Sequence, residues 1–377
     1  MSGVTTTDAD ATLNWYTASI ALRPAAGSNW TCTFSSDTFT TGQTMAAGTA
    51  TTSLYLENNV NTIGFRAAAN VAGATGQTSA VISKPTGTAT DDVLIANLYL
   101  EQNTPYSTIT APSGWTALTE VDNTAAAPDI RHLSYWKRAT ASEPANYTWS
   151  WTPSLWRSGA ISAFSGVVNT GSPIDVEGGG QSGTSASPQA LSVTTSTANT
   201  MLYAMFLFFN SAVVWTDAAG MSTAVKADVI LDDYAIQAAA GASGAKTAGA
   251  NSADDWVAKM IALKPAARTC NLTVTLKQNA ASIGSATVSI TSPAAVTLVT
   301  TLFSTSAVTF ATGDRLNLDL VAPNDGTNCN ARLSFDGTST QSKVVTATIV
   351  PEGLLGLLFL APALPWISKR WKRWRGR

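Results

Sequence analysis

The segment Tyr147-Thr-Trp-Ser-Trp151 alternates large aromatic residues with small hydroxyl residues. Successive side chains of a β-strand point to opposite faces, so Tyr147, Trp149 and Trp151 are expected to share one face. Similar short apolar or alternating runs recur at 93–100, 132–136, 159–164, 191–194, 201–209 and 257–263. Turn-forming clusters separate them, and no long stretch keeps a helical period with caps. This pattern predicts an all-β protein built as a β-sandwich or jelly roll.

The aromatic face of 147–151 has two interpretations. Exposed rings on a sheet can stack on sugar rings, which would make Tyr147, Trp149 and Trp151 a glycan platform. Rings of this size also bury large apolar areas, so the same face can belong to the core. The sequence leaves both interpretations open.

Residues 83–266 contain a weak internal duplication. Three pairs of segments resemble each other: 93–96 and 201–204, 113–116 and 219–222, and 156–161 and 256–261. Similar segments in the same order indicate that one structural unit occurs twice. We therefore expect residues 83–266 to form one jelly-roll-like β-sandwich built from two half-repeats.

Two smaller β domains are expected around this sandwich. Residues 267–349 hold several runs that alternate with period two, separated by tight-turn pairs such as Asn324-Asp-Gly326. Many short strands in so few residues predict an Ig-like sandwich. Residues 27–82 are interpreted as a small degenerate copy of that domain.

The first residues repeat a segment that lies much further along the chain. Residues 15–26 match residues 256–267 at seven of twelve positions, and both segments continue into a Thr-Cys pair. Residues 1–26 are therefore expected to be the last strand of a truncated upstream repeat. Met1 to Asp8 show neither the basic nor the apolar part of an export signal, which fits a chain that begins inside a longer protein.

The composition favours an extracellular protein. Only 12% of the residues are charged, against ~25% in an average globular protein. Thr and Ser suit pleated, half-exposed strands. Outside a basic C-terminal end, 16 basic residues face 24 acidic ones. Because phosphate binding needs a basic surface, nucleic acid is not expected as a partner.

The chain has three cysteines and one histidine, which is too few for an ordinary zinc site. Cys270 and Cys329 are expected to lie in one domain and to form a disulfide in an oxidising compartment. Cys32 has no neighbouring cysteine in its own segment.

No catalytic constellation is evident, and the protein is predicted not to be an enzyme. His132 is the one histidine, no Gly-x-Ser-x-Gly motif occurs, and the six glutamates show no paired pattern typical of glycoside hydrolysis. No cofactor motif is present. Calcium is the one ion considered, with candidate oxygen ligands at Asp91-Asp92, Asp232-Asp233, Asp254-Asp255 and the loop 324–328.

The C-terminal segment has three consecutive parts. The motif Val350, Pro351, Glu352 and Gly353 precedes an uncharged run that ends at Ile367. As a helix this run would rise ~22 Å, which is shorter than the ~30 Å of a bilayer core. A basic tail follows: Lys369, Arg370, Lys372, Arg373, Arg375 and Arg377. We expect residues 350–377 to form a sorting signal or membrane anchor, with a short transmembrane helix in the uncharged run and a basic tail that stays cytoplasmic. The alternative is a helix on the membrane surface.

This order of parts resembles the C-terminal sorting signals of the PEP-CTERM type, with Gly353 in place of the usual final proline. Such signals are processed in bacterial envelopes by exosortase-family transpeptidases. The resemblance covers only residues 349–377. It implies anchoring in, or sorting through, the cell envelope.

The sandwich region also resembles a known kind of module. In order, it carries Pro85-x-Gly87, Gly114-Trp-Thr116, Ala139-Thr-Ala-Ser-Glu-Pro144, Ser165-Gly-Val167 and Pro173-Ile-Asp175. This order is similar to jelly-roll modules found in tandem in bacterial surface and phage tail proteins. The resemblance implies a structural or binding module.

Together these features predict an exported, non-enzymatic protein of the bacterial cell surface or extracellular matrix, with an adhesive or structural role. The membrane and an envelope transpeptidase are the expected partners, with glycans or other surface proteins as further ones. A carbohydrate-binding module is the alternative function, and a hydrolase is a more remote one.

Overall fold

The computed structural model describes residues 12–14, 20–21, 30–35, 43–45, 47–58, 63–292, 297–322, 331–334, 336–337, 340–341, 343–345 and 349–351. Within these residues the regular elements are all strands and their pairs are antiparallel, which confirms the all-β prediction. No helix in the described ranges has the length and apolarity to cross a membrane. The predicted C-terminal helix and the basic tail lie outside the described residues.

The chain divides into two compact units. Residues 60–268 form one unit, and residues 1–59 together with 269–377 form the other. We call them the central unit and the composite unit.

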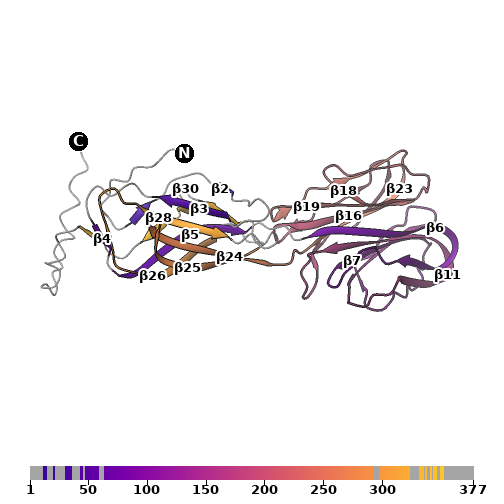
Figure 1. Cartoon of the computed structure of the whole chain (residues 1–377). Coiled ribbons are helices and arrows are strands. Elements are labelled where there is room, and N and C mark those ends of the chain that lie inside the picture. Colours follow the sequence, from indigo (N-terminus) through magenta and orange to yellow (C-terminus); the bar gives the residue numbers. More distant parts are fainter. Residues whose placement is uncertain are drawn as a thin grey trace, which may run out of the picture. The chain divides into compact units, whose positions relative to one another are not determined.

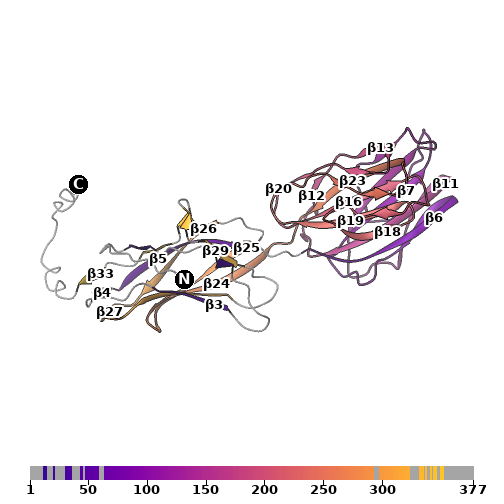
Figure 2. The same cartoon turned by 90° about the horizontal axis from the view of Figure 1, so that it is seen from above.

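The central unit contains two main sheets. The first has the order β6 (Gly64–Ser83), β11 (Asn146–Ser165), β7 (Val93–Glu101), β10 (Ile130–Arg138) and β8 (Thr116–Ala117), with β9 (Val121–Asn123) also on β10. The second has the order β12 (Ile174–Glu177), β23 (Asp254–Leu263), β16 (Thr200–Phe208), β19 (Ile230–Gln237) and β18 (Ser222–Ala227), with β13 (Gln181–Ser185) on β23. The two sheets lie in separate layers (Figures 1 and 2).

Both sheets follow the same strand order, in which β6, β11, β7, β10 and β8 take the places of β12, β23, β16, β19 and β18. Val93 of β7 pairs with Phe164 near the end of β11. Met201 of β16 pairs in the same way with Leu263 near the end of β23. Val93 and Met201 therefore occupy equivalent positions in the two sheets. Both face the layer between the sheets.

The proposed match between residues 156–161 and 256–261 is displaced by one residue. Ile161 packs on the outer face of the first sheet, whereas Ile261 packs between the sheets. A shift of one residue turns every side chain of a strand to the other face, so these two isoleucines are not structural equivalents.

The central strands are buried on both faces. In β7 the first eight residues are buried, and in β16 all nine are. Alternate residues such as Ile95 and Met205 fill the layer between the sheets. The remaining ones, such as Leu98 and Phe206, pack outward against loops. This double burial explains why both strands read as continuous apolar runs rather than alternating ones.

The two sheets are tied together along both edges. At one edge Gly73 N donates to Asp228 Oδ2 at 2.7 Å, and any larger residue at 73 would collide with Asp228 and Trp156. At the other edge Asn123 Nδ2 donates to the carbonyls of Gly183 and Trp256 at 3.3 Å. Hydrogen bonds of this kind link the edges of the two sheets to each other.

The aromatic face of β11 belongs to the core. Tyr147, Trp149 and Trp151 do share one face, but their exposed fractions are 2%, 0% and 5%. Trp115 packs edge-on against Tyr147 and Trp149, with ring centroids 5.1 and 5.0 Å apart. A glycan platform needs exposed ring faces, so that interpretation is wrong for this surface and the core interpretation holds.

Short strands complete the cover of the second sheet. They form three two-stranded pairs: β14 (Gln189–Ala190) with β21 (Lys246–Thr247), β15 (Thr194–Thr195) with β20 (Gly241–Ala242), and β17 (Trp215–Thr216) with β22 (Gly249–Ala250).

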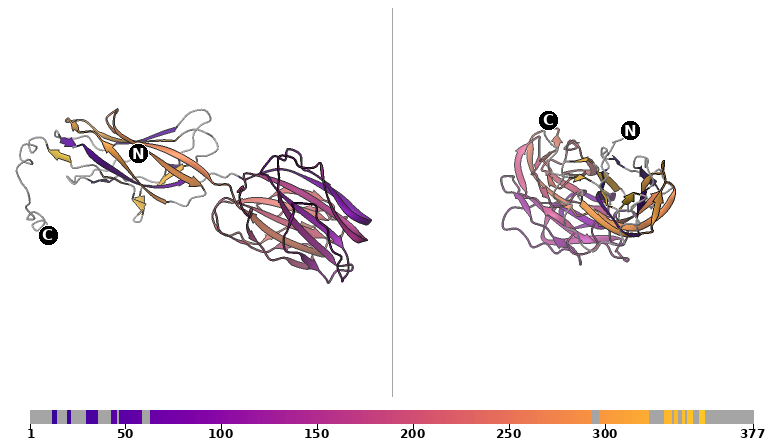
Figure 3. Two further views of the ribbon diagram at one scale, coloured as in Figure 1. Left: turned by 90° about the horizontal axis from the view of Figure 1, so that it is seen from below. Right: turned by 90° about the vertical axis from the view of Figure 1, so that its left-hand side faces the viewer.

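The composite unit joins segments from the two ends of the chain. β3 (Trp30–Ser35) pairs with β28 (Leu316–Ala322), and β5 (Gly48–Asn58) pairs with β26 (Thr297–Thr305). In Figure 3 the early and late strands, indigo and orange, lie together within this unit. The predicted division into a 27–82 domain and a 267–349 Ig-like domain therefore differs from the structure. β6 also belongs to the central unit, where it pairs with β11 rather than with the residues before it.

The remaining strands of the composite unit are β1 (Thr12–Asn14), β2 (Ile20–Ala21), β4 (Gln43–Met45), β24 (Arg268–Gln278), β25 (Ala281–Ser292), β27 (Val308–Phe310), β29 (Ala331–Ser334), β30 (Asp336–Gly337), β31 (Thr340–Gln341), β32 (Lys343–Val345) and β33 (Ile349–Pro351). In β24 every second residue from Cys270 to Leu276 is buried. Val350 and Pro351 of the predicted sorting motif lie in β33, opposite Thr44 and Gln43 of β4. Glu352 and Gly353 lie outside the described residues.

Cys270 is disulfide-bonded. In the sheet, Cys32 of β3 lies opposite Leu320, and Leu320 lies opposite Val274 of β24. Cys32 is thus two strands and four residues away from Cys270. Strand spacing and rise make this roughly 16 Å, well beyond the ~7 Å Cα separation that a disulfide tolerates. Cys329 lies outside the described residues and remains the predicted partner.

We predict that peptide mapping of the unreduced protein links the peptide of Cys270 to that of Cys329. The peptide of Cys32 should carry an alkylated free thiol, and reduction before digestion should release the linked pair as a control. A Cys32–Cys270 link would contradict the strand order of the composite unit.

Candidate functional site

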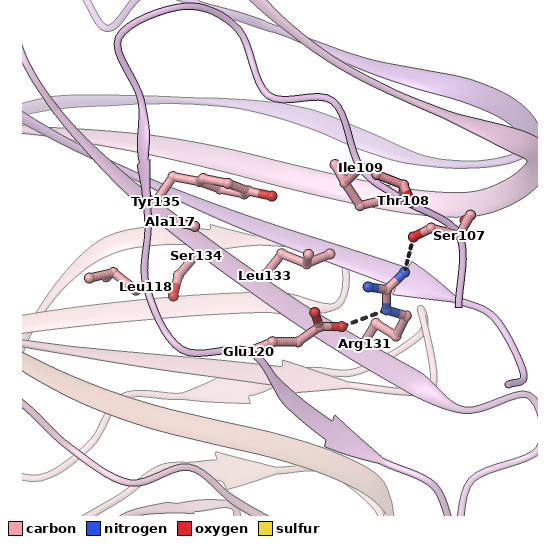
Figure 4. A pocket seen from close by; sticks show the side chains of 10 residues that line it. All are labelled: Ser107, Thr108, Ile109, Ala117, Leu118, Glu120, Arg131, Leu133, Ser134 and Tyr135. Atoms are coloured by element: carbon pink, nitrogen blue, oxygen red, sulfur yellow. Dashed lines mark hydrogen bonds and ion pairs between the residues drawn. The ribbon is translucent and has the colours of Figure 1, made fainter. Parts of the chain in front are cut away.

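A pocket lies on the outer side of the first sheet, between β10 and the chain that connects β7 to β9. Its volume is about 290 Å³. Its lining residues are Ser107, Thr108, Ile109, Ala117, Leu118, Glu120, Arg131, Leu133, Ser134 and Tyr135 (Figure 4). The volume lies at the small end of the ~300–1,000 Å³ typical of small-molecule sites.

β10 supplies the main wall of the pocket. Alternation along the strand brings Arg131, Leu133 and Tyr135 to the same face, where Leu133 and Tyr135 also belong to the outer core. In Figure 4 the Tyr135 hydroxyl points toward Thr108 and Ile109 across the pocket. Within the described part of the chain this hydroxyl has no hydrogen-bond partner, so it is available to a ligand.

Arg131 is held in one orientation although only 4% of it is exposed. Its Nε donates to Glu120 Oε1 at 2.6 Å. Its Nη1 donates to Gln102 Oε1 and to the Ser107 carbonyl, both at 3.1 Å. The guanidinium carbon lies 4.3 Å from the ring centroid of Tyr106. A planar guanidinium fixed by this fork of bonds presents its remaining amino group, Nη2, in a defined direction.

Acidic groups surround this arginine. Glu120 is 33% exposed at the pocket margin, and Tyr106 donates to Asp129 Oδ2 at 3.1 Å. Burial, reinforced by the charge of Glu120, raises the pKa of Asp122 to about 7. The positive charge of Arg131 is therefore already balanced by neighbouring carboxylates.

At the equivalent positions of the second sheet, other residues replace Arg131 and Tyr135. Arg131 lies opposite Leu100 of β7. In the second sheet Phe208 of β16 takes the place of Leu100, and its neighbour, in the place of Arg131, is Val229. Continuing along the strands, Tyr135 corresponds to Asp233, whose Oδ2 accepts from Ala218 N at 2.8 Å. The two halves share a fold, but the residues that make the pocket occur in the first half.

A separate polar cluster joins the two sheets in the interior. Asn97 Nδ2 donates to Asp232 Oδ1 at 2.7 Å, and the Tyr203 hydroxyl donates to Asp232 Oδ2 at 2.7 Å. The phenol has one hydrogen, so Ser162, whose Oγ lies 2.9 Å away, donates to the phenol oxygen. All four side chains are fully buried. Burial raises the pKa of Asp232 to about 7, although its two hydrogen bonds oppose the shift.

His132 is also sealed between the sheets. It has no exposed surface, and neither ring nitrogen has a partner within the described residues. Burial, together with the charge of Lys259, lowers the pKa of His132 to about 3. Lys259 Nζ in turn donates to Glu177 Oε1 and to the Thr119 carbonyl, both at 2.5 Å. A neutral, enclosed imidazole without an acidic partner is not arranged for proton transfer.

The paired aspartates serve structural roles in the described structure. Asp92 accepts from Ala89 N at 2.7 Å and pairs with Arg66 Nε at 2.6 Å. Asp232 and Asp233 point to opposite faces of β19, and Asp255 accepts from the Thr184 hydroxyl. Where the structure describes side chains, no three His, Cys, Asp or Glu residues gather as a metal site would require. The loop 324–328 lies outside the described residues.

The sequence reasoning did not identify Arg131, Glu120 or Tyr135 as a site. One signal was present: Arg131 occupies the same alternating face as Leu133 and Tyr135, and a charged residue on an apolar strand face must find a partner. The identity of that partner depends on how the chain before β10 folds back, which no spacing in the sequence specifies.

No family model matches this chain, and neither do curated proteins or solved structures. Its function must therefore be inferred from its own residues and their geometry.

The Asp232 cluster gives a prediction about stability and pH. A carboxyl whose pKa is raised on folding binds its proton more tightly in the folded state. The stability that it contributes is present below the unfolded pKa of ~3.9 and is lost as the pH rises through about 7. We predict that Asp232→Asn destabilises the protein at pH 5 and that the difference from wild type shrinks by pH 8.

Urea unfolding of the full chain at pH 5, 6, 7 and 8 checks this prediction. Asp91→Asn is the matched control, because Asp91 is exposed and has a φ of 68° that asparagine also adopts. The control measures the effect of removing one exposed carboxylate under the same conditions. A constant difference between Asp232→Asn and wild type across the four pH values would show that Asp232 does not titrate in this range.

Proposed function

We propose that this protein is an exported, non-enzymatic protein of the bacterial cell envelope, with an adhesive or matrix-forming role. The observation that carries the proposal is the C-terminal order of Val350-Pro-Glu-Gly353, an uncharged apolar run and a tail of six cations. An apolar run of this kind favours the membrane, and the tail resists translocation. The body of the protein would then lie on the outer side.

The fold supports such a role in two ways. The central unit is a pair of sheets with buried central strands and joined edges, which makes a rigid module that resists local opening. Its polar interior groups, including His132 and Asp232, are enclosed between the sheets rather than open to a substrate. A scaffold of this kind suits a protein that bears load or presents a surface.

The proposed partners are the membrane, through residues 350–377, and an envelope transpeptidase that processes the motif. Other surface proteins and glycans are proposed as the outer partners. The glycan alternative needs a surface other than Tyr147, Trp149 and Trp151, since these rings are buried.

The test is the intact mass of the mature protein from its native host, combined with cell fractionation. We predict a mature chain that ends near residue 353 and is found in the envelope or the medium. A variant with all six tail cations replaced by glutamine should lose this processing, because nothing would hold the tail on the cytoplasmic side. Lys84→Gln, a change of charge outside the tail, is the control and should be processed normally.

Two other outcomes are informative. A mature chain that keeps Arg377 and is found in the membrane fraction would show that the C-terminal segment is a permanent anchor and not a processed sorting signal. A chain that keeps Arg377 in the soluble cytoplasmic fraction would contradict the proposed function altogether.

A further inference from the structure

We propose that the pocket beside Arg131 and Glu120 binds one neutral sugar ring, so that the central unit recognises the end of a glycan chain. This goes beyond a structural role in the envelope, and it does not depend on how the C-terminal segment is processed. It also assigns glycan recognition to a surface different from the buried aromatic face of β11.

The size of the pocket favours a single ring. A volume of about 290 Å³ is small among ligand sites, which commonly span ~300–1,000 Å³. The space is walled by β10 on one side and by residues 107–109 on the other (Figure 4). A pocket of this volume has room for about one sugar ring, such as the terminal unit of a chain.

The polar groups of the pocket suit vicinal hydroxyls. The guanidinium of Arg131 offers Nη2 as a donor, and Glu120, which also shares a hydrogen bond with Asp122, offers a carboxylate oxygen as an acceptor. These two groups lie next to each other because Arg131 Nε and Glu120 Oε1 are 2.6 Å apart. Adjacent hydroxyls on a sugar ring can accept from one group and donate to the other at the same time.

The orientation of this donor–acceptor pair is fixed before any ligand arrives. Gln102 Oε1 accepts from Arg131 Nη1 at 3.1 Å and also from the Ser107 hydroxyl at 2.8 Å. The same bonds therefore hold Arg131 and the loop that forms the opposite wall. A preorganised pair loses little conformational entropy on binding, which favours affinity for a small ligand.

The rest of the wall suits the apolar face of a sugar. Leu133 and Ile109 supply aliphatic surface, and Tyr135 supplies an aromatic ring with its hydroxyl at the far end. A sugar ring has C–H groups on its faces and hydroxyls around its edge. The pocket has the complementary arrangement, with apolar surface in the middle and hydrogen-bonding groups at both ends.

The charges around the pocket exclude charged ligands. An anionic group would meet the carboxylate of Glu120, and the one arginine that lines the pocket is already paired with Glu120. A cationic group would meet Arg131 Nη2. Because charges of both signs face the same small space, a neutral ligand that both donates and accepts is favoured.

The experiment is a titration of the purified full chain with neutral monosaccharides, followed by ligand-observed NMR and calorimetry. Glucose, galactose, mannose and N-acetylglucosamine are the probes, with glucuronic acid and glucosamine as charged comparisons. We expect at least one neutral sugar to bind at millimolar or lower concentration, more tightly than either charged analogue. Absence of binding by all four neutral sugars at tens of millimolar would overturn the proposal, as would a preference for a charged analogue.

Two variants locate the binding. Tyr135→Phe keeps the ring and removes only the hydroxyl, so it should weaken binding about 3- to 10-fold while the fold is retained. Glu120→Gln removes a charged acceptor and should weaken binding about 10-fold or more. Tyr234→Phe, at a half-buried tyrosine of the second sheet, is the matched control and should leave binding unchanged.

Thermal unfolding of each variant separates loss of the ligand from loss of the fold. If Glu120→Gln unfolds, the comparison of Tyr135→Phe with Tyr234→Phe still shows whether the sugar binds in this pocket. Equal affinity for these two tyrosine variants would show that a sugar, if bound, lies elsewhere. Failure of this titration would leave the envelope proposal intact, because that proposal is tested by the mass and location of the mature chain.

Discussion

The burial of β7 and β16 on both faces is the constraint on which the central unit depends. A strand in this position cannot leave a polar side chain to water on either side, so each polar side chain there needs a partner inside the protein to avoid a free-energy cost. Asn97 of β7 meets this requirement by bonding to Asp232 of the opposite sheet, and Tyr203 of β16 bonds to the same carboxylate. The two sheets are thus joined by specific bonds as well as by apolar contact, which fixes their relative register.

The same constraint produces the pocket. Because the outer faces of the central strands are apolar, the connecting chain must fold over them, and Ile109, Ala111 and Trp115 do so on the first sheet. Arg131 lies at the margin of this cover, where its charge needs polar partners, and the chain before β10 supplies Glu120, Gln102 and the Ser107 carbonyl. A loop that bends around an arginine leaves space beside it. In the second half-repeat Val229 occupies that position and packs in the apolar core.

Local features of the fold could be predicted from the sequence, and features that depend on distant segments could not. Alternation correctly placed Tyr147, Trp149 and Trp151 on one face, but whether that face is exposed depends on Trp115, which lies far from them in the sequence. The segments at 93 and 201 do occupy equivalent positions in the two sheets, whereas matching Trp156 to Trp256 misassigned the register by one residue. In the composite unit, alternation identified the strand at 272–276, yet its sheet includes β3 from the other end of the chain. For the site, a charged residue on an apolar face was visible, but its partners come from the folding of the preceding loop.

Native-state hydrogen exchange on the full chain tests most directly whether the two sheets behave as one body. If the layer between them is shared, the amides of β7 and β16 should exchange only through unfolding of the whole central unit. Both strands should then show the same opening free energy, equal to the unfolding free energy measured with urea. A distinctly lower value for one strand would mean that its sheet opens alone, and it would contradict the account of the interior bonds as the link between the two halves.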